Sequence, residues 1–337
     1  MRHPLPRQPR HQRQNNQNHS MSRHSKDSAS LRQYGGPRYW STWLAYGSIW
    51  LAAQLPFRWQ MAMGRVLGRL AHLFARRRRH ICEVNIALCF PELSRQEQQQ
   101  LVKNTFLSNG MGIMEIGLSW CRNPADFMDR VEVHGLEHLE QARAKGRGVF
   151  LVSAHFCTLE LVGALVSQLF PVCVTYRAHK NPLFDALMKR GRQRHFEAVI
   201  ERKQVRRALR TLQNGKVLWY AADQDYGPKH AVFANFFGRP AATITATTQF
   251  ARFNDSEVLF FAHYRKPDHS GYELHFSEAL EGYPSGDEVR DAERINALIE
   301  AAIRKHPEQY IWLHRRFKTR PPGAPDPYAR NSGQAKP

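Results

Sequence analysis

Residues 148–163, GVFLVSAHFCTLELVG, contain a histidine and a carboxylate whose spacing suits proton transfer. An apolar run ends in small residues, His155 follows, and Glu160 comes five positions later. Positions five apart in a helix lie roughly 140° apart around its axis, so one continuous helix would separate the two side chains. They can meet if His155 lies in a turn before a helix and Glu160 projects back from that helix. We therefore expect a strand, a turn and a helix here, with Glu160 orienting His155 as a general base.

So short a pattern is common by chance, and it also fits a partly buried histidine followed by an exposed glutamate. The position of two other polar residues favours the catalytic interpretation. Arg177 and Asp223, like His155, fall at the carboxyl ends of apolar runs that read as strands. Ligands of α/β proteins bind beyond these ends of the sheet.

Beyond residue 123, short apolar runs alternate with segments of helical pattern. The predicted strands are 149–154, 172–177, 217–222, 258–264 and 272–276, and the predicted helices are 159–170, 182–195, 203–213, 244–253 and 287–305. This alternation predicts an α/β domain with a central, largely parallel sheet flanked by helices. We expect residues 59–330 to form this domain and residues 331–337 to be a loose tail.

The chain is strongly basic. Its 337 residues include 49 Lys and Arg against 29 Asp and Glu, which gives a formal net charge of +20. Such an excess of positive charge favours an anionic partner. The three candidates are a nucleic acid, an anionic membrane surface and a phosphorylated substrate. Nucleic acid is the least favoured of these, because no recognised binding motif is present. Five scattered cysteines without a CxxC pair indicate reduced thiols.

The N-terminal region combines a polar tail with an uncharged aromatic segment. Residues 1–34 are basic and almost free of large apolar side chains, which predicts a disordered tail. Residues 39–57 contain three Trp and no Asp, Glu, Lys or Arg. We expect a membrane anchor helix over 35–58 that either spans the bilayer or lies in its interface. The run RRRRH at 76–80 fits anionic lipid headgroups, or else a solvated helix face.

From about residue 34 to residue 328, the chain resembles the lysophospholipid acyltransferase-like family of lipid A biosynthesis. The resemblance rests on PRYWSTWL at 37–44, NIALCFPELS at 85–94, HFCTLE at 155–160, NPLFD at 181–185, WYAADQDYGPKHAVFANFFG at 219–238 and PEQYIWLHRRFKTRP at 307–321. The HFxxLE motif resembles the lauroyl-type branch more than the myristoyl-type branch, whose motif ends in Asp. The chain departs from the family in its long N-terminal extension and at Ala178, where related sequences often carry Pro.

The resemblance implies a fold like that of the glycerolphosphate acyltransferases, in a bacterial inner-membrane enzyme whose site faces the cytoplasm. It implies transfer of an acyl chain, laurate, from acyl carrier protein to a hydroxyl of a 3-hydroxyacyl chain on Kdo2-lipid IV(A), with no further cofactor. His155 and Glu160 match the family's catalytic pair, while Arg192 and Asp223 match positions at or near its site. The alternative is another acyl chain on lipid A, or another acceptor such as a glycerophosphate or a glycolipid.

An acceptor hydroxyl can attack a thioester directly, so this chemistry needs no Ser or Cys nucleophile. The predicted substrate-binding residues are Arg177, Asn181, Asp185, Arg192, Asp223, Asp225, Arg315 and Arg316. Arg177 and Arg192 could pair with acceptor phosphates, because a guanidinium forks onto phosphate oxygens. The last two arginines could bind an anion or simply end a core strand. Asp223 and Asp225 could orient the arginines or the substrate, and without a His/Cys cluster beside them we predict no metal.

Overall fold

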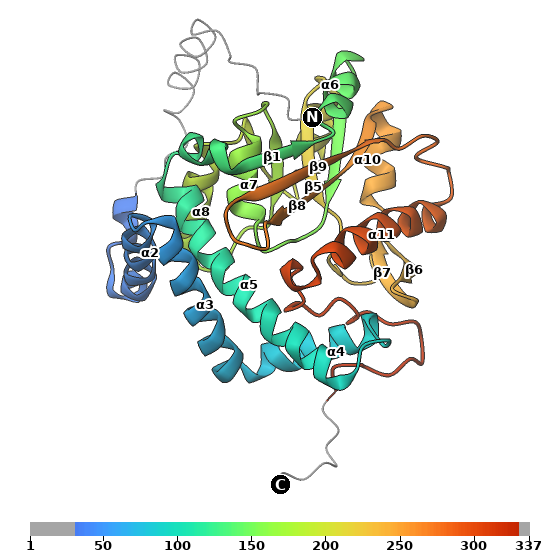
Figure 1. Cartoon of the computed structure of the whole chain (residues 1–337). Coiled ribbons are helices and arrows are strands. Elements are labelled where there is room, and N and C mark those ends of the chain that lie inside the picture. The colour runs from blue at the N-terminus through green and yellow to red at the C-terminus, as the bar shows by residue number, and fades with distance from the viewer. Residues whose placement is uncertain (1–30, 330–337) are drawn as a thin grey trace, which may run out of the picture.

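A computed structural model describes residues 31–329, and its main element is a seven-stranded sheet (Figure 1). The strand order is β1-β9-β8-β2-β5-β3-β4. The strands are β1 (Val131–His134), β2 (Val149–Ser153), β3 (Cys173–Tyr176), β4 (Ala198–Glu201), β5 (Val217–Ala221), β8 (Glu257–Arg265) and β9 (Tyr272–Ala279). Neighbours are parallel except β8 and β9, which are antiparallel. The predicted α/β class and largely parallel sheet are confirmed.

The helices that follow residue 123 alternate with these strands. They are α6 (Leu136–Ala144), α7 (Leu159–Val166), α8 (Pro182–Gln193), α9 (Val205–Gln213), α10 (Ala246–Asn254) and α11 (Glu288–Lys305). All five predicted strands and all five predicted helices are present, with ends shifted by a few residues. The sequence does not predict α6, the four-residue edge strands β1 and β4, or the separate hairpin of β6 (Ala231–Phe236) and β7 (Arg239–Ile244), because such short patterns are ambiguous.

Strand β2 is buried on both faces of the sheet. Side chains of a strand point alternately to opposite faces. Phe150 and Val152 therefore pack into one core cluster, which includes α11, while Val149 and Leu151 pack into a second, which includes α7. This two-sided burial holds the end of β2 in a fixed position.

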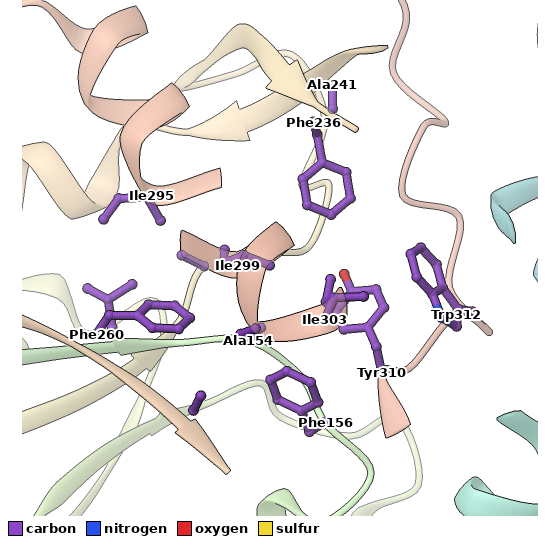
Figure 2. Packing of buried hydrophobic residues seen from close by; sticks show 14 of the residues in the cluster. Ala154, Phe156, Phe236, Ala241, Phe260, Ile295, Ile299, Ile303, Tyr310 and Trp312 are labelled. Atoms are coloured by element: carbon purple, nitrogen blue, oxygen red, sulfur yellow. The ribbon is translucent and has the colours of Figure 1, made fainter. Parts of the chain in front are cut away.

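Helix α11 packs over the turn that follows β2. Figure 2 shows Ile299 and Ile303 on one face of α11, close to Ala154 and with Phe156 below them. Ala154 and Phe156 are both fully buried. Since these two residues flank His155, the backbone of His155 is fixed by the core.

Helices form most of the described chain that precedes β1. They are α2 (Trp40–Ala53), α3 (Phe57–Phe74), α4 (Arg76–Cys89) and α5 (Arg95–Cys121), with short 3-10 turns η1 (Leu31–Tyr34), η2 (Pro37–Tyr39) and η3 (Pro124–Arg130). Figure 1 shows α3 lying along α5. Their backbones approach closely at Gly64, Gly68 and Gly110, where an added Cβ would clash with the opposite main chain. Glycine at these positions permits the close packing.

The predicted single anchor helix over 35–58 is wrong. The chain forms the 14-residue α2, turns, and begins α3 after Pro56. Proline lacks the N–H that would continue a helix and disfavours helical backbone at the residue before it, so the first helix must end here. Within residues 31–329, no helix is both long enough and apolar enough to cross a bilayer.

The prediction of a disordered tail over 1–34 is wrong for residues 31–34. Leu31 and Tyr34 belong to η1 and pack against Tyr39, beside the buried Leu183 and Leu187 of α8. Their apolar side chains give this turn a partner that a polar tail would lack. The predictions for residues 1–30 and 331–337 lie outside the described residues.

Candidate active site

His155 and Asp223 meet where two neighbouring parallel strands end. Strands β2 and β5 lie side by side, and the Ala222 N–H donates to the Ser153 carbonyl at 3.0 Å just before the site. Asp223 Oδ1 lies 2.6 Å from His155 Nδ1 and also accepts from the His155 main-chain N–H at 3.1 Å. A proton on Nδ1 satisfies this carboxylate and makes Nε2 the basic nitrogen, as a general base requires.

Asp223 is fully buried, whereas the His155 side chain is 24% exposed and can be reached from outside. Burial by itself raises the pKa of Asp223. The adjacent His155 outweighs this effect, with smaller contributions from His314 and the Tyr310 hydroxyl, so the pKa of Asp223 lies well below its ordinary value. Asp223 is therefore ionised at neutral pH and stabilises positive charge on the imidazole.

Glu160 pairs with Arg192 and not with His155. Its carboxylate accepts from Arg192 Nε at 3.1 Å, from Arg192 Nη2, and from Trp120 Nε1 at 3.2 Å. Burial raises the pKa of Glu160, but Arg192 and Trp120 outweigh it and the pKa lies below its ordinary value. The prediction that Glu160 orients His155 is therefore wrong, because Asp223, just beyond the end of the neighbouring strand β5, takes that place. Arg192, predicted to bind a substrate phosphate, is already engaged by a carboxylate.

The turn that carries His155 is also held by a segment near the C-terminus. The Cys157 N–H donates to the Gln309 carbonyl at 2.8 Å, and the Ile311 N–H donates to the His155 carbonyl at 3.0 Å. Together these bonds form a short antiparallel bridge across the site. The PEQYIWL segment therefore holds the turn that carries His155 in place.

A second histidine, His263, contacts the residue that follows this turn. Thr158 Oγ1 lies 2.8 Å from Nδ1 of His263, which is fully buried on β8. Burial, reinforced by the nearby His155, lowers the pKa of His263 to about 3. His263 is therefore neutral at physiological pH and serves as a hydrogen-bonding partner for the turn.

The sequence gives no signal for a buried ion pair that lies behind the turn. Arg265 at the end of β8 donates to Glu115 of α5 through Nε and Nη2, both at 2.7 Å, and the Tyr272 hydroxyl donates to the same carboxylate at 2.7 Å. Arg265 also reaches Ser108 Oγ at 3.1 Å and Cys157 Sγ at 3.6 Å. Burial raises the pKa of the Cys157 thiol, so it is not poised as a nucleophile.

Two predicted substrate-binding residues have local structural roles at α8. Asn181 caps the helix by accepting from the Leu183 N–H at 3.0 Å. Asp185 accepts from the His179 N–H at 2.8 Å and pairs with Lys189 at 3.0 Å. Neither residue lies in contact with His155 or Asp223.

The remaining predicted residues are also held by structural contacts, with one exception. Asp225 accepts from the Thr319 N–H and hydroxyl at 2.7 and 2.9 Å, which ties down the C-terminal segment. Arg315 pairs with Asp326 at 2.7 Å. Arg316 is fully buried and donates to the main chain of β7. Arg177, in contrast, is exposed just beyond the end of β3, on the same edge of the sheet as His155.

A family model for bacterial lipid A biosynthesis acyltransferases matches residues 29–319. The chain therefore belongs to the bacterial lipid A biosynthesis acyltransferase family, and the resemblance seen in the sequence is confirmed. The fold and the family match together define the class of this protein as an acyltransferase. Its candidate site joins His155 and Asp223 at the edge of an α/β sheet.

Curated relatives match along most of their length. The chain is 42% identical to the lipid A biosynthesis lauroyltransferase of Escherichia coli strain K12, over 87% of this chain and 96% of the relative. It is 39% identical to the palmitoleoyltransferase of the same organism, over 87% and 95%, and 26% identical to its myristoyltransferase, over 89% and 93%. The names of these relatives state three different acyl chains.

A comparison with solved structures finds the 1-acyl-sn-glycerophosphate acyltransferase PlsC of Thermotoga maritima. It covers 72% of this chain and 98% of that chain, with a TM-score of 0.33 and 13% identity. These values are too low to test the predicted glycerolphosphate-acyltransferase-like fold, which stays a prediction.

Proposed function

We propose that this protein transfers laurate from acyl carrier protein to a hydroxyl of a 3-hydroxyacyl chain on Kdo2-lipid IV(A), with His155 as general base. The observation that carries the proposal is the 2.6 Å contact of the buried Asp223 carboxylate with His155 Nδ1, in a member of the lipid A acyltransferase family. Laurate is chosen because the lauroyltransferase has the higher identity, 42% against 39% for the palmitoleoyltransferase. The small difference keeps a longer unsaturated chain as the second candidate.

In this reaction the acceptor oxygen attacks the thioester carbonyl carbon while His155 Nε2 removes the hydroxyl proton. Negative charge collects on the carbonyl oxygen of a tetrahedral intermediate, and Asp223 stabilises the imidazolium that has formed. The intermediate then collapses with cleavage of the C–S bond. The imidazolium returns its proton to the departing thiolate, so the products are the ester and the free carrier thiol.

In this scheme the Glu160–Arg192 pair is a positioning device. Glu160 is the second residue of α7, the helix that begins directly after the catalytic turn, and Arg192 lies on α8. The ion pair therefore fixes the start of α7 relative to α8, with Trp120 of α5 as a third support. Arg177 is left as the candidate for an acceptor phosphate, since it is exposed at the edge that carries His155.

The carrier protein is expected to be acidic, and a basic surface lies near the site. Arg202, Lys203, Arg206 and Arg210 are exposed on and just before α9. The Arg202 guanidinium lies 5.0 Å from the ring centroid of Tyr226, next to the Asp223 region. This surface supports docking of an acidic donor protein by charge complementarity.

Attachment to the cytoplasmic face of the inner membrane is part of the proposal. Helices α2 and α3 and the turn between them expose many large apolar side chains, and exposed apolar surface of this kind marks an interaction site. They are Trp40, Leu44, Trp50, Leu51, Leu55, Trp59, Met63, Val66, Leu70, Leu73 and Phe74. With the exposed Arg76, Arg77 and Arg78 next to them, this surface suits an amphipathic face lying in an anionic membrane interface.

An acyl-transfer assay tests the reaction. Detergent-solubilised protein is given Kdo2-lipid IV(A) and a set of acyl carrier protein thioesters that includes lauroyl and palmitoleoyl chains. We expect a product with one added laurate, which disappears in His155→Ala but persists in His134→Ala, a matched change at an exposed histidine on β1. Full turnover in His155→Ala refutes the base assignment, and a preference for palmitoleate refutes the donor assignment.

A further inference from the structure

A basic pocket lies beside α3. It has a volume of about 440 Å³ and is lined by Arg58, Arg65 and Arg130, by Phe57 and Met61, and by the turn Asp268–Ser270 between β8 and β9. None of the predicted catalytic or substrate-binding residues lines it. The pocket is therefore a separate feature of the surface.

The charge of this pocket is not balanced from within. No ion pair joins Arg58, Arg65 or Arg130 to a carboxylate in the part of the chain described, residues 31–329. The lining carboxylate, Asp268, already accepts from the Ser270 N–H at 2.9 Å and from its hydroxyl at 2.8 Å. Three arginines thus line a cavity whose one carboxylate is already engaged.

Two of the lining arginines are partly buried, and one of them packs on an aromatic ring. Arg65 and Arg130 are half-buried, and the Arg130 guanidinium lies 5.1 Å from the ring centroid of the buried Phe57. His269 Nδ1 is also buried at this turn and has no hydrogen-bond partner. Arginine presents planar donors that match the oxygens of phosphate and carboxylate groups, so the arrangement suits an oxyanion such as a phosphate.

The place of the pocket on α3 indicates where such a phosphate comes from. At 100° per residue, Trp59, Met63 and Val66 fall on the exposed apolar face of α3. Arg58 and Arg65 fall on the flank between that face and the buried side. Lipid phosphates lie just outside the acyl-chain layer, so a helix whose apolar face enters this layer holds its flanking arginines at phosphate depth.

We propose that this pocket binds the phosphate of an anionic membrane phospholipid and fixes the enzyme at the bilayer surface. The proposal rests on the membrane attachment put forward above but not on the reaction. It differs from general attraction to a negative surface, because specific guanidinium groups are required. Charges elsewhere on the same basic region should matter far less.

Vesicle flotation with matched variants tests this requirement. The full-length protein is mixed with vesicles of phosphatidylcholine alone or with added phosphatidylglycerol. The pocket variant combines Arg65→Gln and Arg130→Gln. The control combines Arg69→Gln and Lys103→Gln, which remove the same charge from exposed positions outside the pocket. Melting temperatures of both variants confirm that they fold.

We expect the pocket variant to bind phosphatidylglycerol vesicles at least about tenfold more weakly than the control, since hydrogen bonds to charged groups are lost. An equal loss in both variants shows diffuse electrostatic attraction and overturns the proposal. If the unaltered protein fails to float at all, the membrane attachment itself is wrong. If all three proteins float equally, attachment stands and the pocket is refuted.

Calorimetry in detergent separates a lipid phosphate from a free one. Short-chain dihexanoyl phosphatidylglycerol is titrated into the protein, and inorganic phosphate is titrated in a second experiment. We expect saturable binding of the lipid that the pocket variant loses and the control keeps. Binding of inorganic phosphate at the same affinity identifies a soluble-anion site and overturns the lipid assignment.

Discussion

Asp223→Asn is the change that tests the base assignment most directly. Asparagine has nearly the shape of aspartate but carries no charge. The carboxylate accepts from His155 Nδ1 at 2.6 Å and from its N–H at 3.1 Å, so the amide oxygen of asparagine can keep both contacts. We therefore expect a folded protein in which His155 stays in place while its imidazolium loses the stabilising negative charge.

The magnitude follows from the kind of hydrogen bond that is lost. A bond to a charged group contributes about 1.5–3 kcal/mol, and a neutral bond about 0.5–1.5 kcal/mol. Full burial of Asp223 strengthens the charged interaction, because water does not screen it. The difference between the two bonds, about 2 kcal/mol in the transition state, lowers kcat roughly 30-fold. An imidazole that also adopts the wrong tautomer extends the loss toward about 10⁴-fold.

Initial rates with Kdo2-lipid IV(A) and lauroyl acyl carrier protein give kcat and KM for this variant, with His155→Ala as the floor and His134→Ala as the control. We expect kcat to fall while KM changes little, since buried Asp223 does not contact substrate. The melting temperature is measured in parallel. A kcat within about threefold of the unaltered protein, at unchanged melting temperature, refutes the role of Asp223.

Four further outcomes are expected. Glu160→Gln leaves Arg192 without its carboxylate partner and should lower the melting temperature by roughly 5–10 °C. An unchanged melting temperature contradicts a structural role for this ion pair. Burial lowers the pKa of His263 to about 3, so between pH 3 and the ordinary pKa of 6.5 only the unfolded chain binds a proton there. The melting temperature should therefore be highest above pH 6.5 and fall on acidification. An equally steep fall in His263→Gln contradicts this origin. Trp59→Glu on the apolar face of α3 should reduce vesicle flotation strongly, whereas Val289→Glu at an exposed position of α11 should not, and equal effects reject the proposed membrane face. Arg206→Glu should raise KM for the carrier-protein thioester at low salt but not for a small thioester. Equal changes in KM for both donors reject docking of the carrier protein on the basic surface of α9.

Local pattern was sufficient for the elements that carry the site. The run from Val149 to Val152 reads as a buried strand because every position is apolar, and β2 begins where that run begins. Since the carboxyl ends of parallel strands share one edge, the sequence also placed His155, Arg177 and Asp223 at the same edge. Pro56 likewise carries the local signal that ends α2, although the absence of charge over 39–57 outweighed it in the prediction of one anchor helix.

The partners of the side chains were decided by the tertiary structure. Glu160 is five positions from His155 in sequence, yet its carboxylate binds Arg192. Asp223, 68 positions from His155, contacts the imidazole instead. The sequence could place both acids near the site but could not choose between them, because the choice depends on which strand lies next to β2.

The same limit applies to the buried interior. Glu115 and Arg265 stand 150 positions apart, and neither has a neighbour in sequence that marks it as half of an ion pair. Apolar periodicity and turn residues are local properties, so the chain by itself determined most of its strands and helices and the position of the candidate histidine. Strand order and helix packing bring distant residues into contact, so only the folded molecule decided that Asp223 contacts His155 and that three arginines line one pocket beside α3.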